Sequence, residues 1–439
     1  MLIKRHQEMQ ALARNLQAEL HTFKGQKAEQ QMYRFAFSEL DSRMGGLPLR
    51  AFFVKKSYEL LRSKSAKSTF FSQKKNLAEF TVKLPFVFEV IITIQYLHNQ
   101  ILDGKAGVTT PEAINQNLLA GNLLKDFLYD YIDNNFSKRT SRIVEKVVRK
   151  AFHYVDMGQY VEKNLNTLAQ FNKCHELSPS FISEEIEAFI DFKGMELFLE
   201  STYKYLPLEY HSFTETYFKR IYLTCAALFK LAAGLLCDLL QVDEQTKEDF
   251  LSFSATYGMM RQIINDNADV VPASHQLHTR HRPATDAFSD WNNKNITLPL
   301  ILLLSDKKTE GVNFSCPIEQ NRQRAFFELL LQSNALFISI HQARLLAALA
   351  KNILPFSGAD ALLLLDTCEI ANWNKFLAPC LKTQEYKLFK RTAAYRYSKK
   401  LIRDVELASE QHSGEQSKEQ VDWKFDVQTL FPAFRPHLG

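Results

Sequence analysis

The chain has 439 residues, and its 54 Lys and Arg against 49 Asp and Glu give a formal net charge of +5. Apolar residues make up 46% of the sequence, and only 14 Gly and 13 Pro occur, which excludes a disordered, collagen-like or low-complexity chain. The charge excess is too small to indicate nucleic-acid binding, and the six cysteines lack a C-x-x-C spacing, which is typical of a reduced, cytoplasmic protein.

Apolar residues recur at helical spacing along most of the chain. In residues 5–23 they lie three and four apart and form one helix face: Met9, Leu12, Leu16, Leu20 and Phe23. The same pattern predicts further helices over residues 83–103, 113–133, 140–170, 217–240, 247–268 and 324–352. Residues 297–304 fit a short strand, or a helix with Pro299 in its first turn. Because period-two alternation is scarce, the sequence predicts an all-α fold, a single large helix bundle.

No segment is predicted to be a signal peptide or to cross a membrane. The first ten residues turn polar at once. The most apolar long window, 223–240, carries Lys230 and Asp238, whereas a membrane span needs about 20 nearly uncharged residues. Residues 382–403 are basic and interleaved with aromatic side chains. This pattern suits an anionic membrane surface, nucleic acid or an amphipathic helix packed on the bundle. We predict no nucleic-acid partner and leave peripheral membrane contact open.

Residues 258–269 place several oxygen-bearing side chains on one helix face. Asn265 and Asp269 are four residues apart, Asp266 and Asp269 are three apart, and Gln262 lies one turn earlier. Such a face suits Mg²⁺, which takes one or two carboxylates together with waters and substrate phosphates. A solvated polar helix end is the alternative interpretation.

A second apolar helix, predicted over residues 83–103, ends in a similar pair. Asn99 and Asp103 are again four residues apart, just before Gly104. An ordinary polar helix C-terminus is the alternative. If the two oxygen-bearing helix ends face each other across a cavity, they predict a cluster of Mg²⁺ ions around a diphosphate.

These two segments resemble the aspartate-rich motifs of the trans-isoprenyl diphosphate synthases, the polyprenyl synthase family, whose all-α fold is shared with class I terpene synthases. Residues 258–269 are similar to G-x-x-x-Q-x-x-D-D-x-x-D, with Asn265 in place of the first Asp. Residues 98–103 are similar to H-D-D-x-x-D, with Asp103 as the surviving carboxylate and Glu89 at the family's position ten residues upstream.

Further segments resemble family motifs in the family's order, over about residues 45–375. They are Gly45–Arg50 (G-G-K-R-x-R-P), Ala120–Leu124 (G-D-x-L-L), Asp156–Gln159 (the G-Q helix), Thr224–Phe229 (K-T-A-x-L-F) and Asn293–Pro299 (K-x-T-L-P). No motif is intact, but their shared order makes a chance match improbable.

The resemblance implies an isoprenoid-synthase-like helical domain over residues 45–375. It lies between an N-terminal amphipathic helical extension, 1–44, and a basic, aromatic C-terminal extension with a polar linker, 376–439. The resemblance also implies a homodimer. The implied Mg²⁺ ligands are Asn99, Asp103, Asn265, Asp266 and Asp269, and the implied catalytic residues are Asp103, Asp266, Asp269 and Gln262. The implied substrate-binding residues are Arg50, Lys105, Gln159, Thr224, Arg280, Arg282 and Lys294.

Several positive charges of the family pattern are missing. Gly45–Arg50 lacks a Lys and an Arg, and Leu223 stands where the family has Lys. Each charge lost beside a diphosphate costs on the order of 1 kcal/mol. We therefore predict a Mg²⁺-dependent prenyltransferase, diverged from standard chain elongation, that ionises an allylic prenyl diphosphate and transfers the prenyl group to isopentenyl diphosphate or another acceptor. Two alternatives stay open: a class I terpene synthase acting on one prenyl diphosphate, and a non-catalytic partner subunit of a prenyl synthase.

Overall fold

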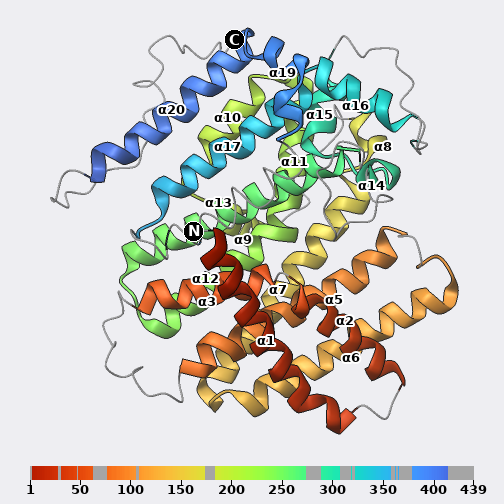
Figure 1. Ribbon diagram of the computed structural model, residues 1–439, viewed down its shortest axis with the longest axis vertical. Coiled ribbons are helices and arrows are strands. Elements are labelled where there is room, and N and C mark those ends of the chain that lie inside the picture. Colours follow the sequence, from red (N-terminus) through yellow and green to blue (C-terminus); the bar gives the residue numbers. More distant parts are fainter. Residues whose placement is uncertain are drawn as a thin grey trace.

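Helices make up nearly all the secondary structure of this computed structural model (Figure 1). The structure describes residues 2–27, 31–46, 48–62, 77–104, 108–173, 183–272, 288–306, 322–356 and 378–413, and the single positions 318, 361 and 364. Among these residues the one β-type pairing is an isolated bridge between Thr167 and Asn295. The predicted all-α fold is confirmed.

The helices of the first half of the chain include the helix that carries the first acidic motif. They are α1 (Leu2–Lys27), α2 (Gln31–Gly45), α3 (Leu49–Arg62), the π-helix η2 (Glu79–Lys83), α5 (Leu84–Leu102), α6 (Pro111–Asn135), α7 (Lys138–Asn164), α8 (Leu168–Phe171), α9 (Glu184–Ile190), α10 (Met195–Tyr203) and η4 (Leu208–Tyr210).

The helices of the second half include the helix that carries the second motif. They are α11 (His211–Ile221), the π-helix η5 (Tyr222–Ala226), α12 (Ala227–Leu240), α13 (Glu244–Asp269), α14 (Ser289–Asn292), α15 (Leu298–Leu304), α16 (Gln323–Gln332), α17 (Ala335–Ile353), η10 (Cys380–Lys382), α19 (Gln384–Phe389) and α20 (Ala393–Ser413).

Local sequence signals set the helix ends around the first motif. The side chains of Thr110 and Ser137 accept hydrogen bonds from backbone N–H groups in the first turns of α6 and α7. Residues 298–304, for which the sequence allowed a strand or a helix, form the helix α15 with Pro299 in its first turn. Helix α5 stops before Gly104, whose φ of +54° suits a residue without a Cβ.

Two predicted helices differ from their apolar patterns. The helix predicted over residues 324–352 is divided into α16 and α17 at Asn334, whose φ is +65°. Helix α7 ends at Asn164, whereas the pattern runs to residue 170. Asn166 instead pairs with Ile296: its side-chain Nδ2 donates to the Ile296 carbonyl at 2.7 Å, and the Ile296 N–H donates to the Asn166 carbonyl at 3.1 Å. These long-range bonds replace the next helical turn, and Figure 1 shows α8 and α14 close together at this place.

Two close backbone approaches fix the centre of the bundle, where η5 lies against α7 and α13. A Cβ on Gly158 of α7 would lie 2.7 Å from Thr224 Cγ2 and 2.9 Å from the Thr224 nitrogen. A Cβ on Gly258 of α13 would overlap the Cα of Ala226. Both glycines of the family-like motifs therefore have a packing role here.

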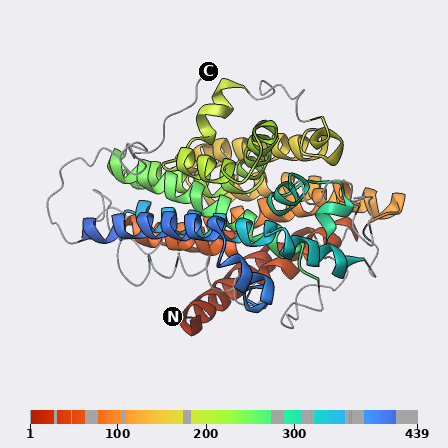
Figure 2. The ribbon, with the colours of Figure 1, turned by 90° about the horizontal axis from the view of Figure 1, so that it is seen from above.

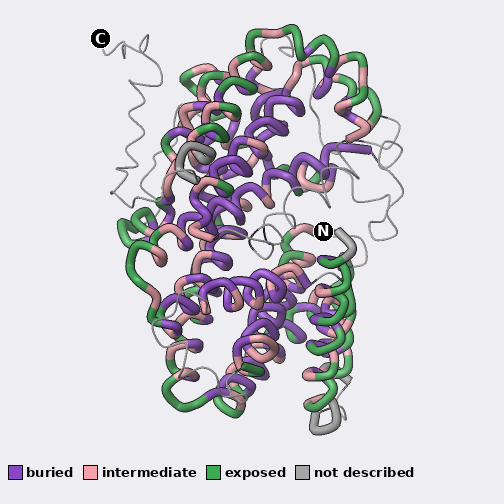
Figure 3. Tube along the Cα trace, turned by 60° about the vertical axis from the view of Figure 1, so that its left-hand side comes forward, coloured by how far each residue is buried: buried purple, intermediate pink, exposed green. Residues whose placement is uncertain are grey.

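The apolar core is continuous through the described residues, from α1 to α20. Helix α13 lies at its centre, packed against α17, α12 and η5, and buried positions gather along the inner helices (Figure 3). Seen from above, the helices form layers, and α20 crosses the left half of the view (Figure 2). Two segments, Glu79–Leu102 and Leu208–Leu240, are long and apolar enough to cross a membrane, but their apolar windows are 78% and 72% buried, as in core helices.

Candidate functional site

The structure brings the C-terminal ends of α5 and α13 to the same region, joined by side chains of α7 and α11. Asn99 and Asp103 of α5 contact α7, and Asp266 of α13 contacts Arg220 of α11. The two predicted motifs therefore belong to one connected polar network.

Asp266 is wholly buried, and both of its carboxylate oxygens accept hydrogen bonds within the protein. Gln262 Nε2 donates to Oδ1 at 2.7 Å. Oδ2 accepts from the Tyr217 hydroxyl at 2.8 Å and from Arg220 Nη2 at 3.3 Å. Gln262, predicted to orient a diphosphate, thus binds the carboxylate one turn away.

Asp269 is also buried and holds the start of α14. Its Oδ1 accepts from the Ser289 N–H at 3.2 Å and the Ser289 hydroxyl at 2.8 Å, and its Oδ2 accepts from the Asp290 N–H at 3.1 Å. Asn265 is the exposed member of this motif and carries no charge. The charged members of the second motif are therefore engaged in the fold, and a neutral amide faces outward.

Two side chains of α7 bind two polar residues of the first motif. Gln159 Nε2 donates to Asn99 Oδ1 at 2.5 Å, and Lys163 Nζ pairs with Asp103 Oδ1 at 2.7 Å. Each pair is four residues from the next on both helices, so α5 and α7 run side by side in register. Asp103 thus meets a cation of the protein itself.

Glu162 connects the two halves of this network. Its Oε2 pairs with Arg220 Nη1 at 3.0 Å, its Oε1 accepts from Asn295 Nδ2 at 2.8 Å, and Lys163 Nζ lies 3.8 Å from Oε1. We call the set Asp103, Glu162, Lys163, Arg220 and Asp266 the ion-pair network. It links α5, α7, α11 and α13 and leaves Arg220 and Lys163 between the two acidic motifs.

Burial dominates the electrostatics of the network. It raises the pKa of Asp266 to about 6, although Arg220, Tyr217 and Gln262 each favour the charged carboxylate. Burial also opposes the charge on Arg220, but Glu162 and Asp266 outweigh it and raise the pKa of that guanidinium. Burial, together with Asp269 and Asp266, raises the pKa of Asp290 well above its usual range. The negative charges of Glu162, Asp266 and Asp290 therefore all act on Arg220.

The raised pKa of Asp266 predicts a specific pH dependence of stability. Because the pKa is about 6 in the folded chain and 3.8 ordinarily, the folded chain binds more protons between these values. The contribution of Asp266 to the free energy of unfolding therefore falls as pH rises from about 4 to about 6. We expect wild-type stability to fall by about 2 kcal/mol relative to Asp266→Asn over that range. Urea unfolding at several pH values measures it; a constant difference would contradict the assignment.

The charged members of the predicted Mg²⁺ site make hydrogen bonds or ion pairs within the protein, whereas Asn99 and Asn265 are exposed. Within the described ranges, no group of three or more His, Cys, Asp or Glu residues is placed to hold a metal ion. Asp266 and Asp269 have both carboxylate oxygens hydrogen-bonded, and one oxygen of partly exposed Asp103, Oδ1, is paired with Lys163. Mg²⁺ binding needs open carboxylate oxygens, so it would require breaking contacts inside the network.

The predicted substrate-binding residues other than Arg50 fall into three groups. Lys105, Arg280 and Arg282 lie outside the described residues. Gln159 and Thr224 are engaged, since the Thr224 hydroxyl donates to the Arg220 carbonyl at 3.0 Å. Lys294 is exposed, next to the Asn295 contact with Glu162.

Arg50, at the start of α3, is not a member of the ion-pair network, but it and Asp266 both act on the pKa of the buried Cys225 thiol, which burial raises. The Arg50 backbone N–H and that of Ala51 donate to buried Glu89 Oε1 at 3.1 and 3.0 Å, which caps α3. The Arg50 guanidinium lies 5.8 Å from the centre of the Phe229 ring. A second arginine shares this area: Arg43, stacked 4.3 Å over Tyr96, also feels the Glu89 charge, while burial lowers its pKa.

The sequence analysis did not identify three cations that lie beside the buried or motif acids: Lys163, Arg220 and Arg43. A signal for Lys163 existed, because Gln159 and Lys163 share the spacing of four that separates Asn99 from Asp103. Arg220 lies in a segment read only as an apolar helix. Its role depends on Glu162 and Asp266, which are 58 and 46 residues away.

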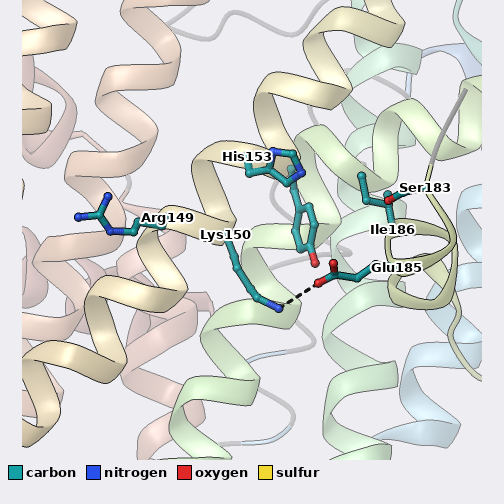
Figure 4. A pocket seen from close by; sticks show the side chains of 7 residues that line it. Arg149, Lys150, His153, Ser183, Glu185 and Ile186 are labelled. Atoms are coloured by element: carbon teal, nitrogen blue, oxygen red, sulfur yellow. Dashed lines mark ion pairs between the residues drawn. The ribbon is translucent and has the colours of Figure 1, made fainter.

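A pocket of about 240 Å³ lies elsewhere, between α7 and α9 (Figure 4). Arg149, Lys150 and His153 line one wall, and Lys150 pairs with Glu185 of the opposite wall at 3.5 Å. Arg149 is paired with Glu145. The cations of this pocket are therefore exposed and already neutralised, and none belongs to either motif.

The sequence matches no protein-family model and no curated protein closely enough to count as a relative. Solved structures match it along most of its length. A polyprenyl synthase from Caulobacter crescentus, complexed with calcium and isoprenyl diphosphate, has a TM-score of 0.54 and 18% identity, covering 82% of this chain and 94% of that one.

Two further solved structures match this chain over a similar length. Heptaprenyl diphosphate synthase from Staphylococcus aureus has a TM-score of 0.55 and 16% identity, covering 83% of this chain and 96% of its own. Octaprenyl pyrophosphate synthase from Helicobacter pylori has a TM-score of 0.55 and 13% identity, covering 82% and 98%. This chain therefore has the isoprenoid synthase fold of the trans-polyprenyl diphosphate synthases.

Proposed function

We propose that this chain acts in cytoplasmic isoprenoid metabolism as a non-catalytic partner subunit of a prenyl diphosphate synthase. One observation carries the proposal: the surviving carboxylates of both motifs are bound by groups of the protein itself. Asp266 and Asp269 are buried and fully hydrogen-bonded, and Lys163 pairs with Asp103. Metal-assisted ionisation of a prenyl diphosphate needs these oxygens free.

The extent of the likeness supports a role as a subunit. This chain covers 94–98% of the three synthases described above, so the shape of a whole synthase subunit is retained. What differs is the chemistry at one end of the bundle, where Asn99 and Asn265 replace acids and Arg220 and Lys163 occupy the space between the motifs. A chain that keeps the shape of a synthase subunit but has its acidic side chains bound within the protein is better suited to contact a catalytic chain than to turn over a prenyl diphosphate.

A Mg²⁺-dependent prenyltransferase, using an allylic prenyl diphosphate and an acceptor, is the second candidate. The exposure of Asn99 and Asn265 and the partial exposure of Asp103 favour it, because these three oxygens are the ones a solvated cation reaches. A class I terpene synthase would need the same metal ligands. The loss of the Lys and Arg at the segment Gly45–Arg50 favours a single-substrate cyclase over elongation within this second candidate.

The partner-subunit proposal is tested by adding the purified chain to each trans-prenyl diphosphate synthase encoded in the same genome. We expect it to form a mixed dimer with one of them, in place of the homodimer implied by the resemblance. That synthase should then change its turnover or the length of its product. Size-exclusion chromatography with light scattering and mass spectrometry of the products are the readouts. A chain that stays a homodimer and alters no product would contradict the proposal.

A further inference from the structure

Helices α19 and α20 and the turn between them carry exposed cations. Seven Lys and Arg residues are exposed, and we call them the basic surface: Lys387, Lys390, Arg391, Arg396, Lys399, Lys400 and Arg403. Residues 382–403 contain eight Lys and Arg and one Glu, so this segment has a net charge of +7, more than the +5 of the whole chain.

The geometry of α20 separates an inner from an outer face. Arg396, Lys399, Lys400 and Arg403 follow the spacing of one helical stripe, and all are exposed. On the other side, Ser398, Leu401 and Val405 are buried, and α20 packs along α17. Figure 1 shows α20 at the outer edge of the bundle. The stripe therefore faces away from the core.

Acidic residues do not neutralise the basic surface. Every exposed residue from 382 to 403 is basic, neutral polar or apolar, and the exposed acid nearest the stripe is Glu406, one turn after Arg403. In the part of the chain that the structure describes, no ion pair involves any of its seven cations. Lys390 and Lys399 lie over the rings of Tyr386 and Tyr395 and keep their charges in solvent. Such a surface is complementary to a polyanion.

The uncharged side chains distinguish lipid from nucleic acid. Single-stranded RNA would need exposed aromatic rings for its bases to stack on. Here Tyr386 and Phe389 are buried and pack against Phe337, and the rings of half-buried Tyr395 and Tyr397 pack against His341 and Tyr205. The exposed apolar residues are instead leucines: Leu388, 52% exposed among the cations of α19, and Leu407, 42% exposed at the end of the stripe. Aliphatic anchors among cations are typical of membrane-surface binding.

We propose that the basic surface of α19 and α20 docks on an anionic lipid bilayer. Its cations would contact lipid phosphates and carboxylates, and Leu388 and Leu407 would enter the boundary between head groups and acyl chains. The docking rests on surface charge and exposure, and it holds whether or not the chain turns over a prenyl diphosphate.

The outer face of α7 provides a matched control, because it is also basic but lacks the other features. Lys138, Arg139, Arg142 and Lys146 lie on it, together with Arg149, which is neutralised by Glu145. No exposed leucine lies among these residues. In Figure 2 α7 and α20 lie in different layers of the bundle. Reversing charges on either face therefore changes net charge equally but tests different surfaces.

The test is co-sedimentation of the full chain with phosphatidylcholine vesicles, with and without phosphatidylglycerol. We expect binding only to the anionic vesicles, weakening as salt rises. Replacing Arg396, Lys399, Lys400 and Arg403 with Glu should lower the partition coefficient at least about tenfold. Replacing Lys138, Arg139, Arg142 and Lys146 with Glu should change it less than about twofold. Leu388→Ser should weaken the binding that survives high salt.

Several outcomes would overturn the proposal. They are equal losses in the two charge-reversed variants, equal binding to neutral vesicles, and binding to single-stranded RNA without binding to vesicles. Circular dichroism and thermal melting check that each variant is folded. If the fourfold variant does not fold, Lys399→Gln with Lys400→Gln replaces it, and an unchanged partition coefficient for that pair would equally overturn the proposal.

Discussion

Replacing Gly258 with alanine is expected to lower the free energy of unfolding by about 3 kcal/mol, because the new methyl group would overlap the backbone of Ala226 in η5. A backbone atom cannot move aside as a flexible side chain can, so α13 and η5 must separate. The separation would also disturb the contacts that α13 makes with α12 and η5 at the centre of the core. Urea unfolding followed by circular dichroism measures the loss.

The matched control is Gly234→Ala in α12, also a helix-interior glycine. Its new Cβ would meet only Leu251 Cδ2, at an ordinary 3.4 Å. We expect this variant to be as stable as wild type, or to gain up to about 1 kcal/mol from helix propensity. If both variants lose stability equally, the close approach of α13 to η5 is not the cause.

Replacing Arg220 with methionine is expected to cost about 3 kcal/mol of unfolding free energy, because a buried cation would be removed from between two acids. Asp266 and Glu162 would keep their positions without the guanidinium that pairs with them at 3.3 and 3.0 Å. Methionine fills similar volume, so the loss reports the charge and not a cavity. The pKa of Asp266, already about 6 from burial, should rise further in this variant.

A double-mutant cycle with Asp266→Asn isolates the pair. We expect the two substitutions together to cost clearly less than the sum of their separate costs, because each removes the same interaction. Arg149→Met, at an exposed pair with Glu145, is the comparison and should leave the unfolding midpoint unchanged. Additive costs for Arg220 and Asp266 would mean that the ion-pair network does not hold the site together.

The all-α fold could be predicted from the sequence because apolar residues at helical spacing and local capping residues determine the helices. Thr110 and Ser137 cap the helices that follow them, and Pro299 opens α15. The end of α7 was not predictable in this way. It depends on Asn166 bonding to Ile296, which is 130 residues away, and such a contact has no signature in the local pattern.

The sequence indicated that residues of the two motifs would lie near each other, but it did not indicate which groups of the protein would bind them. Asn99, Asp103, Gln262 and Asp266 do lie in one connected region, as motif order suggested. The sequence did not indicate that these groups would be bound from within. That result depends on Arg220, whose partners come from two other helices.

The ion-pair network also places opposite charges between the two polar helix ends. In a site built for metal ions, unpaired carboxylates repel one another until cations bind. Here Arg220 pairs with Glu162 and Asp266, and Lys163 pairs with Asp103, so these ion pairs link α5, α7, α11 and α13.

Diphosphate release by the purified chain alone is the most direct test of a non-catalytic role. The chain would be incubated with Mg²⁺ and the ten-, fifteen- and twenty-carbon allylic diphosphates, with and without isopentenyl diphosphate, and free diphosphate and organic products measured. We expect no release above that of a heat-denatured sample. Mg²⁺-dependent release that is abolished by Asp103→Ala would contradict a non-catalytic role and establish the metal-dependent enzyme instead.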